Sequence, residues 1–259
     1  MRLYLASTSP ARRALLAQSG IEPVLVSPGV DEDAVGAAAA ASLGRALTGP
    51  ELVSLLAVAK ASAVADSAVD GVVFGGDSAF EVDGQLYGKP HDPAVARERW
   101  RQMLAAGGGT LWSGHCVIDR RRDDRHRDPE PATGRPGGAA PARTVPPVRS
   151  LVTSTAGVPQ LGAVAPGGSA LAAGGDRVVA VDSAVLTFAD DVSVDEIDAY
   201  VATGEPLEVA GAFTIDGRAA AYITRIDGAP SAVIGMSLPV LRSMLLRGFG
   251  IAWHDLWTL

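Results

Sequence analysis

Cysteine, asparagine and lysine are scarce in this sequence: it has one cysteine, no asparagine, and two lysines among its 22 basic residues. A single thiol excludes an intramolecular disulfide, and a reducing compartment is the simplest inference. Cys116 lies in an apolar strand pattern, without neighbours that would favour a thiolate, so we expect a small buried hydrophobic side chain. Nucleophilic covalent catalysis therefore has no good candidate.

Long apolar runs and a surplus of basic charge are also missing. There is no signal-peptide h-region, and no uninterrupted apolar stretch long enough to span a bilayer, so we expect a cytoplasmic protein without a membrane partner. The formal net charge of -7 argues against a protein that holds nucleic acid through many phosphate contacts. It does not argue against binding a single nucleotide.

Motifs of the common nucleotide and metal sites are absent as well. The sequence has no P-loop, Rossmann glycine fingerprint, zinc-ligand spacing or nucleophile elbow. The four histidines do not fall at metal-ligand spacings, and His115 alternates within a strand pattern, which indicates a structural role. A catalytic site would therefore have to come from dispersed charged residues.

Strand patterns alternate with helix patterns along the chain, which predicts an α/β fold with a mixed sheet. With 259 residues, of which 47% are hydrophobic, we expect a single domain over residues 1–259. Residues 120–177 are the exception and are interpreted as a low-complexity insertion. Residues 120–149 have too few large apolar side chains to order themselves, and residues 150–176 show no steady period. Residues 209–217 and 219–226 are predicted to be rich in strand.

Residues 72–90 combine two charged side chains with a hairpin signal. An apolar run at 72–74 predicts a buried strand that stops at Gly75-Gly76 and delivers the carboxylate of Asp77. Asp83-Gly84 between apolar residues then predicts a hairpin turn, and Lys89 follows the returning strand. Local geometry would place Asp77 near Lys89, which suits a metal-bound phosphate. A surface hairpin with two solvated charges would have the same pattern.

The N-terminal segment predicts a strand, a turn and a helix that starts at an anion site. Ser9 is a good N-cap, Pro10 a good first helical residue, and Arg12 falls in the first turn. A helix start presents free backbone N–H groups and a positive dipole end. With the Ser7 and Ser9 hydroxyls and the Arg12 guanidinium, it would form a phosphate cradle. An ordinary capped surface helix is the alternative.

An acidic segment and two lysines complete the charged set. Glu32 follows a short strand at 24–26, where a carboxylate facing an anion site can hold Mg²⁺ beside phosphates, although acidic loops are often only solvated. Lys60 lies beside the apolar stripe of a helix predicted from residue 49 to 66, where a lysine can also merely snorkel. Arginine supplies every other basic residue, so Lys60 and Lys89 stand out as compact charges, unless they are left over by chance.

These residues suit phosphoryl or nucleotidyl chemistry assisted by a divalent ion. The cations would neutralise phosphate oxygens, the carboxylates would hold Mg²⁺ or Mn²⁺, and one carboxylate could orient or deprotonate water. The residue types do not say which phosphate bond is cut.

The chain also resembles the Maf family of nucleoside triphosphate pyrophosphatases. Each matching segment is weak alone, but the segments occur in family order and cover nearly the whole chain outside the insertion. The matches are Leu5-Ala6-Ser7-Thr8-Ser9-Pro10-Ala11-Arg12, Val30-Asp31-Glu32, Lys60-Ala61, Gly75-Gly76-Asp77-Ser78, Gly88-Lys89-Pro90, Gly204-Glu205-Pro206, Ala210-Gly211-Ala212-Phe213 and Ile226-Asp227-Gly228.

The resemblance implies a two-lobed Maf/ITPase-like α/β fold, with a central mixed sheet, helices on its faces and a cleft between the lobes, and often a homodimer. It implies hydrolysis of a nucleoside triphosphate between the α and β phosphates with a divalent metal. By position, Asp77 matches the catalytic carboxylate and Glu32 a second acidic residue, the pair that would hold the metal. The phosphate-binding positions are matched by Ser7, Ser9, Arg12, Lys60 and Lys89.

Departures from the family pattern affect one cation and the base. Ala11 stands where an arginine is usual, so one cation is missing unless Arg13 replaces it. Members that act on thymidine and uridine triphosphates usually have Lys and Gln where this chain has Val209 and Asp216. The base specificity implied by the resemblance is therefore open.

The leading hypothesis is a metal-dependent pyrophosphatase of non-standard or pyrimidine nucleoside triphosphates. The rival hypothesis is a nucleotide-binding regulator of cell division or septum formation with weak or no catalysis, because the family has been linked to septum formation. A third, nucleic-acid binding, would have to rest on the basic run of residues 120–122 in the insertion.

Overall fold

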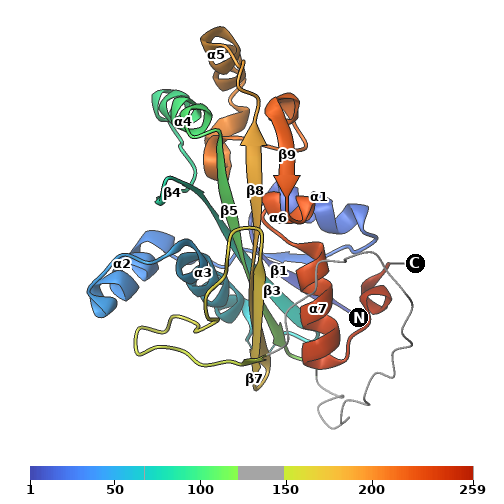
Figure 1. The fold of residues 1–259 in the computed structure, drawn as a ribbon. Helices are drawn as coiled ribbons and strands as arrows, with labels where there is room; N and C mark the ends of the chain where they lie inside the picture. Colours follow the sequence, from blue (N-terminus) through green and yellow to red (C-terminus); the bar gives the residue numbers. More distant parts are fainter. Residues whose placement is uncertain (67, 122–148, 259) are drawn as a thin grey trace, which may run out of the picture.

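The computed structural model describes residues 1–66, 68–121 and 149–258 (Figure 1). The expectation of disorder for residues 120–149 lies largely outside the described residues. In chain order the elements are β1 (Leu3–Ala6), α1 (Pro10–Gln18), β2 (Val24–Val26), α2 (Glu32–Leu43), α3 (Gly49–Val64), β3 (Val72–Val82), β4 (Gln85–Tyr87), α4 (Pro93–Ala105), β5 (Gly108–Asp119), β6 (Arg149–Ser150), β7 (Ser169–Gly174), β8 (Arg177–Phe188), α5 (Val194–Ala202), the 3-10 helices η1 (Glu205–Glu208), η2 (Ala210–Ala212) and η3 (Arg218–Tyr222), β9 (Ile223–Asp227), α6 (Pro230–Val233), α7 (Leu238–Phe249) and η4 (Trp253–Leu256).

The described strands form one nine-stranded mixed sheet in the order β2-β1-β3-β5-β8-β7-β6, with β4 paired to β3 and β9 to β8. β1 lies parallel to both β2 and β3, while β5 and β8 continue the sheet in antiparallel fashion. Figure 1 shows α2 and α3 on one side of the sheet and α7 on the other. The predicted α/β architecture with a mixed sheet is confirmed.

Strand β3 is the central element, and it is longer than the sequence predicts. It runs without a break from Val72 to Val82, so the expected stop at Gly75-Gly76 is wrong and Asp77 lies within the strand. Gly75 serves close packing instead of a turn, as does Gly114 on the neighbouring strand. A Cβ on Gly75 would lie 2.5 Å from the carbonyl oxygen of Ala57, and a Cβ on Gly114 of β5 would overlap that of Val53. Helix α3 therefore rests directly on the sheet backbone.

The alternation of side chains along β3 divides the core between the two faces of the sheet. Val73 and Ala79 pack with the apolar face of α3, including Val53, Ala57 and Ala61. Residues of the opposite parity point to the other face. Val72 and Phe74 pack there with α7, and Phe80 and Val82 pack with α4 and α5. Asp77 has the parity of Val73 and Ala79, so β3 directs its carboxylate to the α3 side.

Replacing Gly114 with alanine is expected to destabilise the fold by about 3 kcal/mol or more, because the new methyl group meets a backbone carbonyl of α3 that has no room to move. The measurement is the unfolding free energy from denaturant titration. Gly88→Ala is the matched control: a Cβ there meets no atom within 4 Å, so we expect a change of no more than about 1 kcal/mol. Equal effects of the two substitutions would contradict the close-packing role of Gly114.

Two stretches differ from the sequence prediction. Residues 150–176 were expected to show no regular pattern, yet β7 pairs antiparallel with β8 from Ser169 to Gly174, and Leu171 is buried. This strand consists mostly of alanine and glycine, so its sequence lacks the alternation of large apolar and polar side chains that would indicate a strand. Residues 209–217 and 219–222 form 3-10 turns and connecting segments, with strand only in β9, because Gly211 adopts a positive φ of 79° that interrupts any extended run.

Local sequence signals elsewhere were accurate. Ser9 caps α1 by accepting a hydrogen bond from the Arg12 backbone N–H, and Ser193 caps α5 with the predicted capping box. Among the helices of the described residues, none combines the length and apolar content that a membrane span requires.

Candidate functional site

An open stretch of the β3 edge defines the candidate site. β5 covers one edge of β3 along nearly its full length. On the other edge, β1 pairs with residues 72–75 and β4 with residues 80–82. Residues 76–79 therefore have no strand partner on that edge in the described part of the chain. Asp77 lies in this gap, where backbone and side chain are accessible to groups from α1, α2 and α3.

A lysine joins two carboxylates in the gap. The Nζ atom of Lys60 lies 2.7 Å from Oδ1 of Asp77 and 2.7 Å from Oε1 of Glu32. The side chains of Lys60 and Asp77 are 9% and 11% exposed, whereas that of Glu32 is 48% exposed. Lys60 comes from the helix that the glycines hold against the sheet, and Glu32 from the first turn of α2. The three residues that the sequence placed on separate segments thus form one ionic cluster.

Burial sets the acidity of Asp77. Loss of water raises the pKa of its carboxyl above the ordinary value, while the charges of Lys60 and Arg12 act in the opposite direction. A carboxylate of raised pKa accepts a proton more readily near neutral pH. The environment of Asp77 therefore suits a residue that orients water or takes its proton.

Arg12 is buried beside this cluster, and most of its donors are already used. Nε donates to the Gly235 carbonyl at 2.9 Å and Nη1 to the Gly76 carbonyl at 2.9 Å. Longer hydrogen bonds run from Nη1 to the Ser7 hydroxyl at 3.3 Å and from Nη2 to the Ser78 hydroxyl at 3.4 Å. Burial lowers the pKa of the guanidinium, against the opposing charges of Asp77 and Glu32. Arg12 therefore ties α1, β3 and the segment before α7 together next to the gap.

The predicted cradle at the start of α1 is correspondingly more closed than expected. The Ser9 hydroxyl caps the helix, and the Ser7 hydroxyl accepts hydrogen bonds from both the Ser9 backbone N–H and Arg12. Ser7, Ser9 and Arg12 do lie together, as the sequence predicts. Their polar atoms hydrogen-bond one another. Arg12 therefore acts on the gap mainly through its positive charge, because most of its N–H groups already have acceptors.

Lys89 pairs with a carboxylate outside this cluster in the structure. The Asp83-Gly84 turn forms as predicted, but β4 ends at Tyr87, and the Lys89 ammonium lies 3.7 Å from the carboxylate of Glu208. Among the described residues, Lys89 makes no ion pair with Asp77, and the expectation that local geometry places the two near one another stays a prediction. Its side chain is 51% exposed, which leaves it free to reorient.

Sequence reasoning missed the partners of Arg12. Gly235 is 223 residues away from Arg12 along the chain, and no local signal connects them. Ser78 was noted only as part of a motif. The interpretations of His115 and Cys116 are supported: both are buried, the His115 ring accepts the Ser237 N–H at 2.8 Å, and burial lowers the pKa of His115 to about 3 and raises that of Cys116 to about 12.

Glu32 and Asp77 are the residues here that fit a divalent cation. In the described part of the chain no group of three or more His, Cys, Asp or Glu side chains could hold a metal. Mg²⁺, however, is commonly bound by one or two carboxylates and completed by water and substrate phosphates. Because both carboxylates contact one Nζ atom at 2.7 Å, their oxygens lie no more than twice that distance apart. Such a donor pair fits a hard cation that replaces the ammonium.

Comparison with known proteins gives one family. The model described as "Maf-like protein" matches residues 2–133 and 162–248. The chain is 46% identical over 262 residues to the nucleoside triphosphate pyrophosphatase of Leifsonia xyli subsp. xyli, covering 100% of this chain and 97% of that protein. It is 39% identical over 257 residues to the protein of the same name from Nocardia farcinica, covering 98% and 96% of the two chains.

Proposed function

The chain belongs to the Maf family, and we propose that it is a nucleoside triphosphate pyrophosphatase that hydrolyses the bond between the α and β phosphates, releasing a nucleoside monophosphate and pyrophosphate. The observation that carries this proposal is the buried Asp77 beside Lys60 and Glu32 at the open edge of β3. Full-length relatives that bear this activity in their names support the overall assignment.

In the proposed reaction Asp77 and Glu32 would hold a divalent cation, Mg²⁺ or Mn²⁺, which would neutralise phosphate oxygens and lower the pKa of water. The Asp77 carboxylate orients the attacking water and accepts its proton. Lys60, released from its two carboxylates, donates to phosphate oxygens, where charge develops as the anhydride breaks. Lys89 leaves Glu208 and binds the departing pyrophosphate. Buried Arg12 adds positive charge near the phosphates and, through its hydrogen bonds, holds the segments around the gap in place.

The proposed substrates are non-standard or pyrimidine nucleoside triphosphates. Val209 and Asp216 replace the lysine and glutamine usual in thymidine- and uridine-type members. Val209 directly follows Glu208, the partner of Lys89, and Asp216 lies in the bend between η2 and η3. Neither side chain offers the same hydrogen bonds as the residue that it replaces. We therefore expect a base preference that differs from that of the thymidine and uridine type.

A nucleotide panel tests the proposal. We expect release of stoichiometric pyrophosphate and monophosphate from at least one triphosphate in the presence of Mg²⁺ or Mn²⁺, and loss of the activity on chelation by EDTA. Separation of the products shows which bond is cut, because cleavage at the γ phosphate would yield orthophosphate and a diphosphate. A folded sample that releases no pyrophosphate from any standard or modified nucleotide would overturn the assignment.

A further inference from the structure

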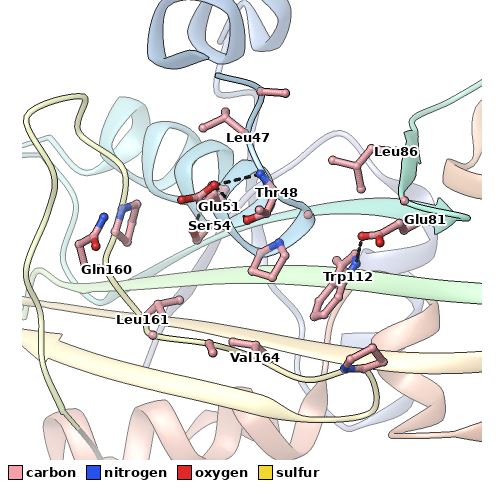
Figure 2. A pocket seen from close by; sticks show the side chains of 18 residues that line it. Leu47, Thr48, Glu51, Ser54, Glu81, Leu86, Trp112, Gln160, Leu161 and Val164 are labelled. Atoms are coloured by element: carbon pink, nitrogen blue, oxygen red, sulfur yellow. Dashed lines mark hydrogen bonds between the residues drawn. The ribbon is translucent and has the colours of Figure 1, made fainter. Parts of the chain in front are cut away.

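A cavity lies on the α3 side of the sheet, and no residue of the Asp77 cluster lines it (Figure 2). Its volume is about 680 Å³, within the range of small-molecule sites. Trp112 and Glu81 contribute from the sheet. The other walls are the turn before α3 with its first residues, the β3–β4 hairpin, and the loop of residues 159–166. None of the residues that line it belongs to the Glu32, Lys60 and Asp77 cluster.

Most of the polar side chains that line the cavity already have hydrogen-bond partners within the protein. Both oxygens of the Glu51 carboxylate accept hydrogen bonds from Arg45, and Thr48 donates to one of them. The Glu81 carboxylate differs: Oε2 accepts the Trp112 indole N–H at 2.8 Å, as Figure 2 shows, whereas no described residue donates to Oε1. Glu81 therefore presents one uncommitted carboxylate oxygen to a cavity with a largely apolar lining.

The remaining lining excludes an anionic ligand. It contains no lysine, arginine or histidine, and its large side chains apart from Gln160 are apolar: Leu47, Leu86, Trp112, Leu161 and Val164. Phosphate oxygens would meet the Glu81 carboxylate without a compensating cation. Glu81 is four residues after Asp77 on the same face of β3, about 13 Å along the strand. The cavity thus has the opposite charge preference from the phosphate site.

One wall of the cavity comes from a segment that the family model does not match. The model stops at residue 133 and resumes at 162, so Pro159, Gln160 and Leu161 lie outside it. Val158 and Leu161 are buried, which anchors this segment against the sheet and α3. The cavity is therefore not a general consequence of the matched family core.

We propose that this cavity binds a small organic cation, a primary amine carried on an apolar body. The ammonium pairs with Oε1 of Glu81, where the surrounding apolar side chains strengthen the attraction by excluding water. The apolar body fills the space between Trp112, Leu86 and the loop of residues 159–166. This ligand class is distinct from the triphosphate, so the site adds a second binding function to the proposed enzyme.

Binding of 2-phenylethylamine to the whole protein, measured by isothermal titration calorimetry and ligand-observed NMR, tests the proposal. Phenylacetate has a similar ring with the opposite charge, and we expect it to bind at least tenfold more weakly. Glu81→Gln keeps an acceptor for Trp112 but removes the charge, so amine binding should weaken at least tenfold. Glu98→Gln, which makes the same chemical change at an exposed carboxylate of α4 that does not line the cavity, is the control and should leave amine binding unchanged.

Pyrophosphatase activity of the Glu81→Gln protein, together with an unchanged circular dichroism spectrum, shows that the variant is folded. Equal binding of amine and acid, no binding of the amine by the folded wild type, or an unchanged amine affinity in Glu81→Gln would each overturn the proposal. Amine binding and pyrophosphate release are measured in separate assays. A negative result for amine binding therefore leaves the proposed pyrophosphatase activity standing, and a negative nucleotide panel leaves the amine site standing.

Discussion

The Asp77→Asn variant is expected to lose about a thousandfold in turnover of its best triphosphate while still binding the nucleotide. Asparagine has nearly the same shape and can accept a hydrogen bond from Lys60, so the cluster should remain assembled. It cannot take a proton from water, and it is a poorer ligand for a hard divalent cation than a carboxylate. The loss should therefore appear in kcat. Pyrophosphate release gives kcat, and titration with a non-hydrolysable triphosphate analogue gives affinity.

The chain offers a matched control for this substitution. Glu81→Gln makes the same chemical change on the same face of β3, but outside the cluster, and we expect near wild-type turnover. Equal losses in the two variants would mean that any carboxylate removed from this strand disturbs the fold. Full activity in Asp77→Asn would remove Asp77 from the reaction and leave its buried pair with Lys60 as a structural contact.

Local signals in the sequence were sufficient for the start of α1 and for the hairpin after β3. Ser9 before Pro10 fixed the start of α1, and Asp83-Gly84 fixed the hairpin, because capping and turn chemistry depend on a few adjacent residues. The mixed α/β fold followed from the alternation of such elements. Ser7, Ser9 and Arg12 could be placed together because one turn of chain connects them.

Long-range packing accounts for what the sequence did not reveal. Gly75 looked like the end of a strand, but its role is to let the backbone of α3 approach, and that need arises from the packing of the preceding helix on the sheet, which the residues around Gly75 do not reveal. The same approach delivers Lys60 to Asp77, 17 residues away. The Gly235 carbonyl that holds Arg12 has no signature at all, since it is a backbone atom in a turn.

The contact that Lys89 makes with Glu208 has a physical reason too. A hairpin predicts which residues face each other only while the strands remain paired, and β4 ends two residues before Lys89. Beyond that point the chain follows other contacts: Arg99 hydrogen-bonds the Gly88 carbonyl, and the His91 backbone N–H donates to Leu207. The route of the chain after a hairpin is therefore decided by tertiary partners.

The Lys60→Met variant is expected to separate two effects of one side chain. Turnover should fall at least a hundredfold, because the donor proposed for the phosphate oxygens is lost. Affinity for Mn²⁺ without nucleotide should instead rise about tenfold or more. In the free protein the ammonium contacts both carboxylates at 2.7 Å, so a metal must break two charge-assisted hydrogen bonds to bind. A tenfold change in affinity corresponds to about 1.4 kcal/mol. This is no more than the contribution of a single hydrogen bond to a charged group.

Direct Mn²⁺ titration by calorimetry or electron paramagnetic resonance, in the absence of nucleotide, measures the second effect independently of activity. Lys89→Met is the matched control, because it removes the other lysine of the chain from an exposed position on Glu208. It should lower turnover without changing Mn²⁺ affinity. If Mn²⁺ affinity is unchanged or weaker in Lys60→Met, the lysine does not compete for the place of the metal, and Glu32 and Asp77 hold no cation between them. If Mn²⁺ affinity rises in Lys60→Met and not in Lys89→Met, the Lys60 ammonium occupies the cation position until a triphosphate binds and accepts its hydrogen bonds.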